Sequence, residues 1–215
     1  MTAMPLWKNA AVAVDIVVTT VVEGELRLLV HRRGEPPDRG EWALPGVFVQ
    51  PDEALAAAAG RALRDKARLD GIFVEQLYTF GEPGRDPRGR VIAIAYYALV
   101  PAERLTAALA AAADDSLQLV PATEPPPLAF DHDRIVAVTV ERLRGKLSYS
   151  AVGFELLPEA FTLRDLRGIH EAILGRPLNK DSFRRRMLGS GELHATGDRE
   201  RGLANRPAEY YRRRS

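Results

Sequence analysis

The sequence of 215 residues contains no cysteine. Disulfide bonds and thiolate metal sites are therefore excluded, which is consistent with a reducing compartment. The first ten residues lack the basic region and apolar stretch of a secretion signal, and no apolar run approaches the roughly 18 residues that a membrane span requires. We therefore expect a soluble, cytoplasmic protein with no membrane association.

Charge is unevenly distributed along the chain, although the net charge is only +1. Residues 151–215 hold 13 Lys and Arg against 9 Asp and Glu, a net charge of +4, which leaves 17 against 20, or −3, for residues 1–150. Lys and Arg gain free energy on a polyanion by releasing the counterions around its phosphates. The basic C-terminal part therefore suggests a nucleic-acid-binding module, while chance explains the charge alone equally well.

The first 100 residues alternate between strand and helix patterns. β-Branched and apolar runs separated by turn residues predict five strands, and a helix from Asp52 to Leu69 follows the third of them. The predicted strands are 11–22, 25–32, 43–49, 72–80 and 91–100. With a hydrophobic content of 46%, this order predicts an α/β (α+β) fold, a sandwich built around a mixed sheet.

Residues 101–150 complete the predicted first domain, which spans 1–150. The stretch 101–129 is ambiguous, because helix formers are followed by a strand-like run and by a Pro-rich segment that cannot be helical. A helix from Asp131 to Tyr149 follows, with Asp131 as a plausible N-cap. Its residues at helical spacing are Ile135, Val138, Arg142 and Leu143.

Residues 151–215 predict a winged helix-turn-helix domain. Its first helix, 163–175, has Thr162 as its cap and Gly175 as its stop. A second helix begins at Asn179 or Lys180 and reaches Gly191, and a polar, Gly-rich hairpin follows. The connector before the first helix should pack against a domain through Phe154, Leu156 and Leu157.

Residues 46–69, "GVFVQPDEALAAAAGRALRDKARL", resemble the phosphate-chemistry box of Nudix hydrolases, which cleave nucleoside diphosphates linked to another group. Gly46, the acidic pair after it and Arg61 match that pattern, and the lead-in "HRRGEPPDRGEWALPG" is also similar. In the family, glutamates three and four residues apart project from one helical face and hold Mg²⁺ against a pyrophosphate.

The box departs from the family pattern at its acids. Ala62 stands where a glutamate is expected, the expected Glu-Glu pair reads Asp65 and Lys66, and Arg68 replaces a glycine. A lysine among metal ligands repels the cation and offers no carboxylate oxygen. We therefore expect no catalytic residues and lost or very slow hydrolysis, with Glu53 and Asp65 as weak metal candidates. The alternative is an ordinary amphipathic helix.

The loop "RDPRGR", residues 85–90, supports a nucleotide ligand, because arginine is well shaped for bidentate phosphate contacts. With its flanking strands, this segment is similar to ADP-ribose-type Nudix proteins, although such a loop is most often a solvated turn. By this resemblance, the expected ligand-binding residues are Arg32, Phe48, Arg61, Arg88 and Arg90, with Phe48 as a stacking surface.

The second helix of the C-terminal domain places cations on one face. Phe183, Met187 and Leu188 can face the core while the basic residues turn outward, which is typical of a recognition helix in a major groove. The expected DNA-binding residues are Lys180, Arg184 and Arg185 on the helix, with Thr196, Arg199, Arg201 and Arg206 on the wing. The alternative is a solvated Arg-rich face, since acids lie among the bases.

Nearly the whole chain resembles the Nudix-related transcriptional regulators of NAD metabolism. The resemblance implies a homodimeric repressor of NAD biosynthesis or salvage genes that binds a pseudo-palindromic double-stranded DNA operator. It also implies an effector, ADP-ribose or a related NAD metabolite, and no required cofactor. Two rivals remain: an Mg²⁺-dependent ADP-ribose pyrophosphatase using Asp52, Glu53, Asp65 and Glu75, and a protein-interaction scaffold.

Overall fold

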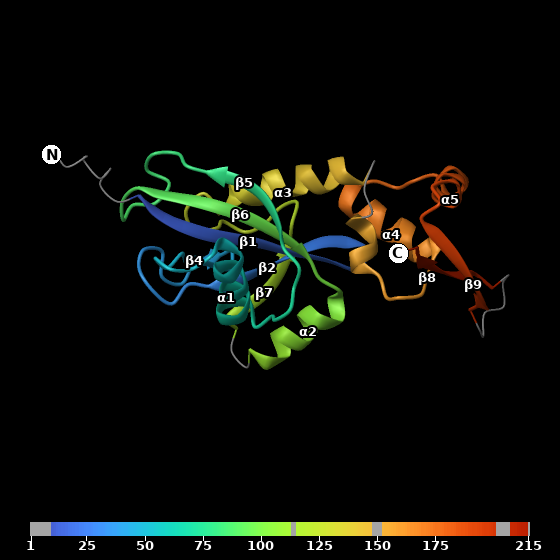
Figure 1. Ribbon diagram of the computed structural model, residues 1–215, viewed down its shortest axis with the longest axis horizontal. Coiled ribbons are helices and arrows are strands. Elements are labelled where there is room, and N and C mark those ends of the chain that lie inside the picture. The colour runs from blue at the N-terminus through green and yellow to red at the C-terminus, as the bar shows by residue number, and fades with distance from the viewer. Residues whose placement is uncertain (1–9, 113–114, 148–151, 201–206, 215) are drawn as a thin grey trace.

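The computed structural model describes residues 10–112, 115–147, 152–200 and 207–214. Within these ranges the chain forms a seven-stranded mixed sheet flanked by helices and a separate three-stranded sheet with two helices. The two parts follow one another along the long axis of the molecule (Figure 1). The predicted α/β sandwich and winged helix are confirmed.

The large sheet is built around strand β1 (Ala11–Val22). β1 pairs in parallel with β6 (Val91–Leu99) and antiparallel with β2 (Glu25–Arg32) and β4 (Gly46–Phe48). The remaining strands are β3 (Trp42–Ala43), β5 (Glu75–Phe80) and β7 (Leu117–Pro121), which pair with β2, β6 and β2 respectively. β1 is buried on both faces over most of its length, which identifies it as the centre of the sheet.

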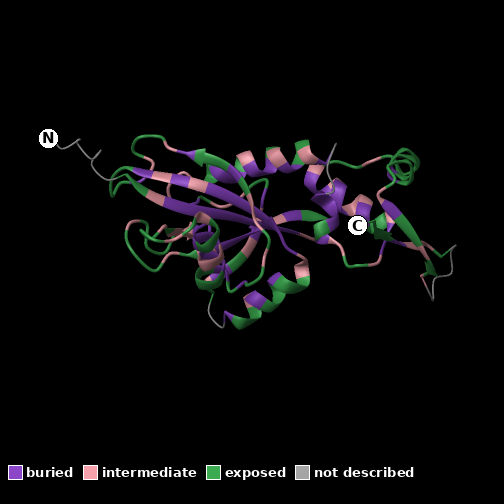
Figure 2. Cartoon of the chain, viewed as in Figure 1, coloured by how far each residue is buried: buried purple, intermediate pink, exposed green. Residues whose placement is uncertain are grey.

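Helices cover both faces of this sheet. α1 (Leu55–Ala67) and α2 (Ala102–Ala111) share one buried cluster with the even-numbered side chains of β1, while α3 (His132–Lys146) shares the opposite cluster with residues such as Val17. Four alanines of α1 are fully buried, so the helix lies close to the strands (Figure 2). The ambiguous stretch 101–129 contains both a helix, α2, and a strand, β7.

The predicted start of α1 and the predicted side-chain cap of α3 need correction. α1 begins at Leu55, three residues after Asp52, and has no acid in its first turn, because Asp52 and Glu53 belong to the preceding turn. Asp131 occupies the N-cap position of α3, but its side chain makes no capping bond. That carboxylate is committed to an ion pair with Arg85, an interaction that local spacing does not reveal.

The C-terminal part contains α4 (Leu163–Leu174), α5 (Lys180–Gly189), and the strands β8 (Phe161–Thr162), β9 (Leu193–Arg199) and β10 (Glu209–Arg213). Thr162 caps α4 in a reciprocal capping box with Asp165, and Gly175 ends α4 in the left-handed conformation, both as predicted. Asn179 accepts a hydrogen bond from the Ser182 backbone at the start of α5. α5 ends two residues before the predicted Gly191.

A small core joins α4, α5 and the wing strands. It contains Phe154, Phe161, Leu166, Phe183, Met187, Leu193 and Tyr211. Phe183 and Met187 are buried as predicted, but the prediction that Leu188 faces this core is wrong, because its side chain is 44% exposed. Leu188 follows Met187 directly, and adjacent residues on a helix point in different directions.

The connector and α4 belong to both parts of the molecule. The connector forms a short 3₁₀ helix, η1 (Val152–Leu156), which packs as the sequence predicts. Val152 and Leu156 of η1, together with Ile169 and Ile173 of α4, lie in the core cluster of the large sheet, whereas Leu166 lies in the small core. α4 is therefore the packing bridge between the two sheets. No helix among the described residues has the length and apolar character to cross a bilayer.

Replacement of Ile173 by alanine tests this bridge. Ile173 is fully buried, so Ile173→Ala should lower the free energy of unfolding by about 2–5 kcal/mol through lost burial and the cavity left behind. Leu188→Ala, a similar truncation at an exposed position, should change it by less than about 0.5 kcal/mol. Chemical denaturation of both variants would make the comparison, and equal effects would contradict the shared core.

Candidate functional site

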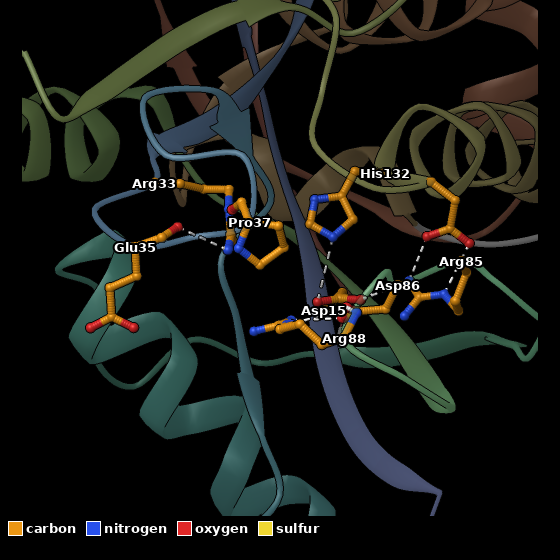
Figure 3. A network of polar contacts seen from close by, with 9 residues as sticks. Asp15, Arg33, Glu35, Pro37, Arg85, Asp86, Arg88 and His132 are labelled. Atoms are coloured by element: carbon orange, nitrogen blue, oxygen red, sulfur yellow. Dashed lines mark hydrogen bonds and ion pairs between the residues drawn. The ribbon is translucent and has the colours of Figure 1, made fainter.

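A cavity of about 710 Å³ opens beside β1, within the size range of small-molecule sites. Its walls come from β1, β2, β4, α1, the loop between β5 and β6, and the residues that lead into α3. Its ionisable lining residues are Asp15, His31, Arg33, Glu35, Arg61, Asp65, Lys66, Arg85, Asp86, Arg88 and His132. The cavity therefore collects charged side chains from segments far apart in the sequence (Figure 3).

Arg85 is the buried centre of this polar cluster. Its side chain is only 4% exposed, and its guanidinium lies 2.5 Å from Asp131 and 3.4 Å from Asp15. A second bond runs from Arg85 Nε to Asp131 at 3.0 Å. Burial by itself lowers the pKa of Arg85, but the hydrogen bonds to Asp131 and the charge of Asp15 outweigh it, so the group stays charged.

His132 lies beside this cluster as a neutral ring. Its Nδ1 accepts a hydrogen bond from the Leu44 backbone N–H at 3.0 Å, so the ring proton belongs on Nε2, which faces Asp15 at 3.8 Å. Complete burial lowers the pKa of His132 and outweighs the opposing effect of Asp15. His132 therefore links β1 to the backbone before β4 without adding charge.

Gly46 has a steric reason to be glycine. A Cβ atom at this position would lie 2.3 Å from Asp15 Oδ1 and 3.0 Å from the Val14 carbonyl oxygen. Since Asp15 is held by Arg85, its carboxylate has little freedom to move away. The glycine of the box is thus required by close backbone approach to the polar cluster.

Aromatic rings and guanidinium groups form another wall of the cavity. Arg88 lies 4.8 Å from the centroid of Phe48 and 5.3 Å from that of Phe130, and Arg33 lies 4.6 Å from Phe130. Arg88 is held in place by Asp86, which is 4% exposed and accepts bonds at 2.6 and 2.9 Å. Phe48 is 42% exposed and offers an open ring face. Such a wall suits a planar base next to an anion.

The helix α1 and the turn before it contribute few acids to the cavity. Glu53 forms a two-point ion pair with Arg61 at 2.7 and 2.8 Å, which, with the Gln50 backbone N–H, lowers the pKa of Glu53 to about 2. Ala62 is fully buried against the sheet. Asp65 and Lys66 are exposed and line the cavity. Within the described ranges, no group of three or more His, Asp or Glu is arranged to hold a metal ion.

The predicted ligand-binding residues divide into two sets. Phe48, Arg61 and Arg88 line the cavity together. Arg32 and Arg90 are not among the lining residues: Arg32 stacks on Trp42 at 4.7 Å, and Arg90 donates to the Gly81 carbonyl oxygen. Glu75, a predicted helper for a metal, is instead paired with Lys146 at 2.5 Å and lies away from the cavity lining.

Several lining residues were missed by sequence reasoning. Arg85 and Asp86 belong to the "RDPRGR" loop. The arginines of this loop already indicate a phosphate ligand, so the sequence does point to this segment. Asp15 is an acid inside an otherwise apolar strand, which also marks it as unusual. Arg33 lies in the lead-in "HRRGEPPDRGEWALPG", directly after the predicted Arg32, so it also carries a local signal. Phe130 and His132 carry none, because only the fold brings them beside β1.

The winged helix carries a second concave surface of about 720 Å³ between α4, α5 and the wing strands. Lys180, Arg184 and Arg199 line it with Arg164 and Arg167 of α4. Arg185 is exposed on α5 outside this lining, and the Thr196 hydroxyl donates to the Tyr210 carbonyl oxygen within the hairpin. Arg201 and Arg206 lie outside the described residues.

A mixed sheet with a box-bearing helix, followed by a winged helix, defines a two-part protein of the Nudix class. Residues 10–138 match the NUDIX domain, and residues 153–213 match the NrtR DNA-binding winged helix domain. The chain therefore belongs to the NUDIX family and, along nearly its whole length, to the NrtR regulators.

Relatives support both parts. The chain is 35% identical to the ADPR responsive transcriptional repressor NtrR of Acinetobacter baylyi, over 96% of this chain and 83% of that protein. It is 33% identical to an ADP-ribose pyrophosphatase of Methanocaldococcus jannaschii, over 61% of this chain and 73% of that protein.

Solved structures show the same arrangement. Shewanella oneidensis NrtR in complex with a 27mer DNA superposes with a TM-score of 0.82 at 34% identity, covering 94% of this chain and 93% of that one. The NUDIX domain of that NrtR with ADP ribose superposes with a TM-score of 0.54 at 30% identity, covering 64% of this chain and 90% of that domain.

Replacement of Arg85 by methionine tests the buried cluster. Arg85→Met leaves the buried Asp15 without its countercharge and should lower the free energy of unfolding by about 3–5 kcal/mol. Arg134→Met removes an exposed pair with Glu82 in the same region and should cost less than about 1 kcal/mol. Thermal and chemical unfolding would measure both, and an Arg85 variant as stable as the control would contradict the assignment.

Proposed function

We propose that this chain is a repressor whose affinity for operator DNA falls when ADP-ribose, or a related NAD metabolite, binds in the cavity beside β1. The observation that carries the proposal is the combination of aromatic rings and guanidinium groups at that cavity, on the same chain as a winged helix with a cationic face. By this proposal the regulated genes are those of NAD biosynthesis or salvage.

The cavity chemistry suits a nucleoside diphosphate. Phe48 and Phe130 offer ring faces for a base, and Arg88 and Arg33 lie beside those rings to meet phosphate oxygens. The NUDIX domain of Shewanella oneidensis NrtR is known with ADP ribose, which supports the choice of ligand. Arg61 also lines the cavity, and its bonds to Glu53 and to the Phe48 carbonyl oxygen hold β4 against α1.

We infer that the cavity binds its ligand without hydrolysing it. Mg²⁺ in such a site needs carboxylate oxygens beside the phosphates. Ala62 supplies none, Glu53 is held by Arg61, and Lys66 places a positive charge next to Asp65. The similarity to an ADP-ribose pyrophosphatase favours hydrolysis as the second candidate function, but the donor set of this chain does not fit the metal.

The DNA-binding role belongs to α5 and the wing. Lys180, Arg184 and Arg185 are exposed on α5, whereas Phe183 and Met187 of the same helix are buried. Such a helix suits the major groove, with Arg199 of the wing near the backbone phosphates. We propose a homodimer, in which two winged helices read the half-sites of a pseudo-palindrome.

Coupling between the two sites would run through α4. This helix places Ile169 and Ile173 in the core of the large sheet and Leu166 in the core of the winged helix. A ligand shifts the equilibrium between two arrangements of the sheet domain only by the difference between its binding free energies for them. Such coupling free energies are typically about 1–3 kcal/mol. That range corresponds to about 5–150-fold in operator affinity.

A gel-shift titration with ADP-ribose tests the proposed function. With DNA from upstream of NAD-synthesis genes, saturating ADP-ribose should weaken operator binding by about 5–150-fold, because the effector favours the arrangement that binds DNA less well. Adenosine at the same concentration serves as the control. Unchanged binding with ADP-ribose, or its conversion to AMP and ribose phosphate with Mg²⁺ at ordinary enzymatic rates, would contradict the proposal.

Replacement of Arg184 by alanine should separate the two sites. Arg184→Ala removes an exposed cation of α5. The free energy of operator binding should therefore become less favourable by about 1–3 kcal/mol, while ADP-ribose affinity is unchanged. Arg104→Ala, which removes an exposed cation of α2 in the sheet domain, is the matched control. Gel shifts and calorimetry would measure the two affinities, and parallel loss of both would argue against separate sites.

A further inference from the structure

The cations of the cavity differ in how their charge is compensated. Arg61, Arg85 and Arg88 are each paired with a carboxylate of the chain. Among the described residues, Arg33 and Lys66 form no such ion pair, and Arg33 instead donates to the carbonyl oxygens of Pro37 and Glu35. Lys66 is therefore a cation that lines the cavity with its charge unmatched by an ion pair.

The neighbours of Lys66 show that its charge acts on the cavity. Lys66 lies in the last turn of α1, directly after Asp65, and His31 of β2 lines the same cavity. Burial, followed by the positive charge of Lys66, lowers the pKa of His31 to about 4, so His31 stays neutral near pH 7. The positive charge on this side of the cavity therefore comes from the ammonium group and not from the histidine.

Two of the four carboxylates that line the cavity are unavailable to a metal ion. Asp15 is paired with Arg85, and Asp86 is held by Arg88. Glu35 and Asp65 form no such pair among the described residues, and a cation bound at Asp65 would meet the ammonium of the next residue. An ammonium group donates three hydrogen bonds and accepts none, so it suits phosphate oxygens and cannot ligate Mg²⁺.

We propose that Lys66 is the built-in counter-ion for the diphosphate of the effector, so that the pocket binds the nucleotide without needing a bridging magnesium ion. This inference rests on the proposed function, since it assigns a residue to the same ligand. It makes Lys66 a specificity-determining residue for diphosphates, and it makes effector sensing independent of the Mg²⁺ concentration.

Calorimetric titration of the full chain with ADP-ribose, in EDTA and in excess MgCl₂, tests the inference. The native protein should bind with equal affinity in both buffers, because the ammonium is always present. Lys66→Glu should weaken binding in EDTA by about tenfold or more, since it puts a carboxylate beside the phosphates. Mg²⁺ should restore part of that loss, because the new carboxylate and Asp65 together offer oxygen ligands.

Arg64→Glu is the matched control, because it reverses a charge in the same part of α1 at an exposed residue outside the cavity lining. Its ADP-ribose affinity should stay within about twofold of native. Equal losses in the two variants, or native binding that disappears in EDTA, would overturn the role of Lys66. If the native chain binds no ADP-ribose in either buffer, the proposed function itself fails. Both positions are exposed, and melting curves would verify that each variant is folded.

Discussion

The buried guanidinium of Arg85 is the interaction on which the cavity depends. It joins Asp15 of β1 to Asp131 at the start of α3, and Arg85 itself belongs to the loop between β5 and β6. A charge this deeply buried is tolerated only when its partners are close and hydrogen-bonded. Three segments distant in sequence are therefore fixed together, and Gly46 follows as a steric consequence of the same carboxylate.

The cavity is arranged in advance for an anion. Most of its cations are held by carboxylates of the chain, which fixes the position of each side chain before a ligand arrives. Arg33 and Arg88 both lie against the ring of Phe130, and burial together with the charge of Arg88 lowers the pKa of Arg33. Phosphate oxygens between the two guanidinium groups would reduce the electrostatic repulsion between them. That reduction would add to the binding free energy of the ligand.

Local sequence patterns predicted elements well and long-range contacts poorly. β1 and β2 occupy the predicted ranges, and Thr162 caps α4 as expected, because alternation and capping depend on neighbouring residues. The ion pair of Asp131 with Arg85 spans 46 positions, and no local pattern encodes it. Ligand roles for Phe48, Arg61 and Arg88, and the domain boundary at residue 150, stay predictions.

The two-sided packing of α4 limits how this protein can be rearranged. Ile169 and Ile173 are covered by the sheet domain, although they sit inside the winged helix segment of the sequence. A winged helix cut away at the connector would carry an uncovered apolar stripe, and a chimera with an unrelated receptor domain would need a new surface shaped to fit that stripe. The sheet domain and the winged helix therefore cannot be exchanged independently of each other. A change of specificity preserves this packing when it is made inside one of the two domains.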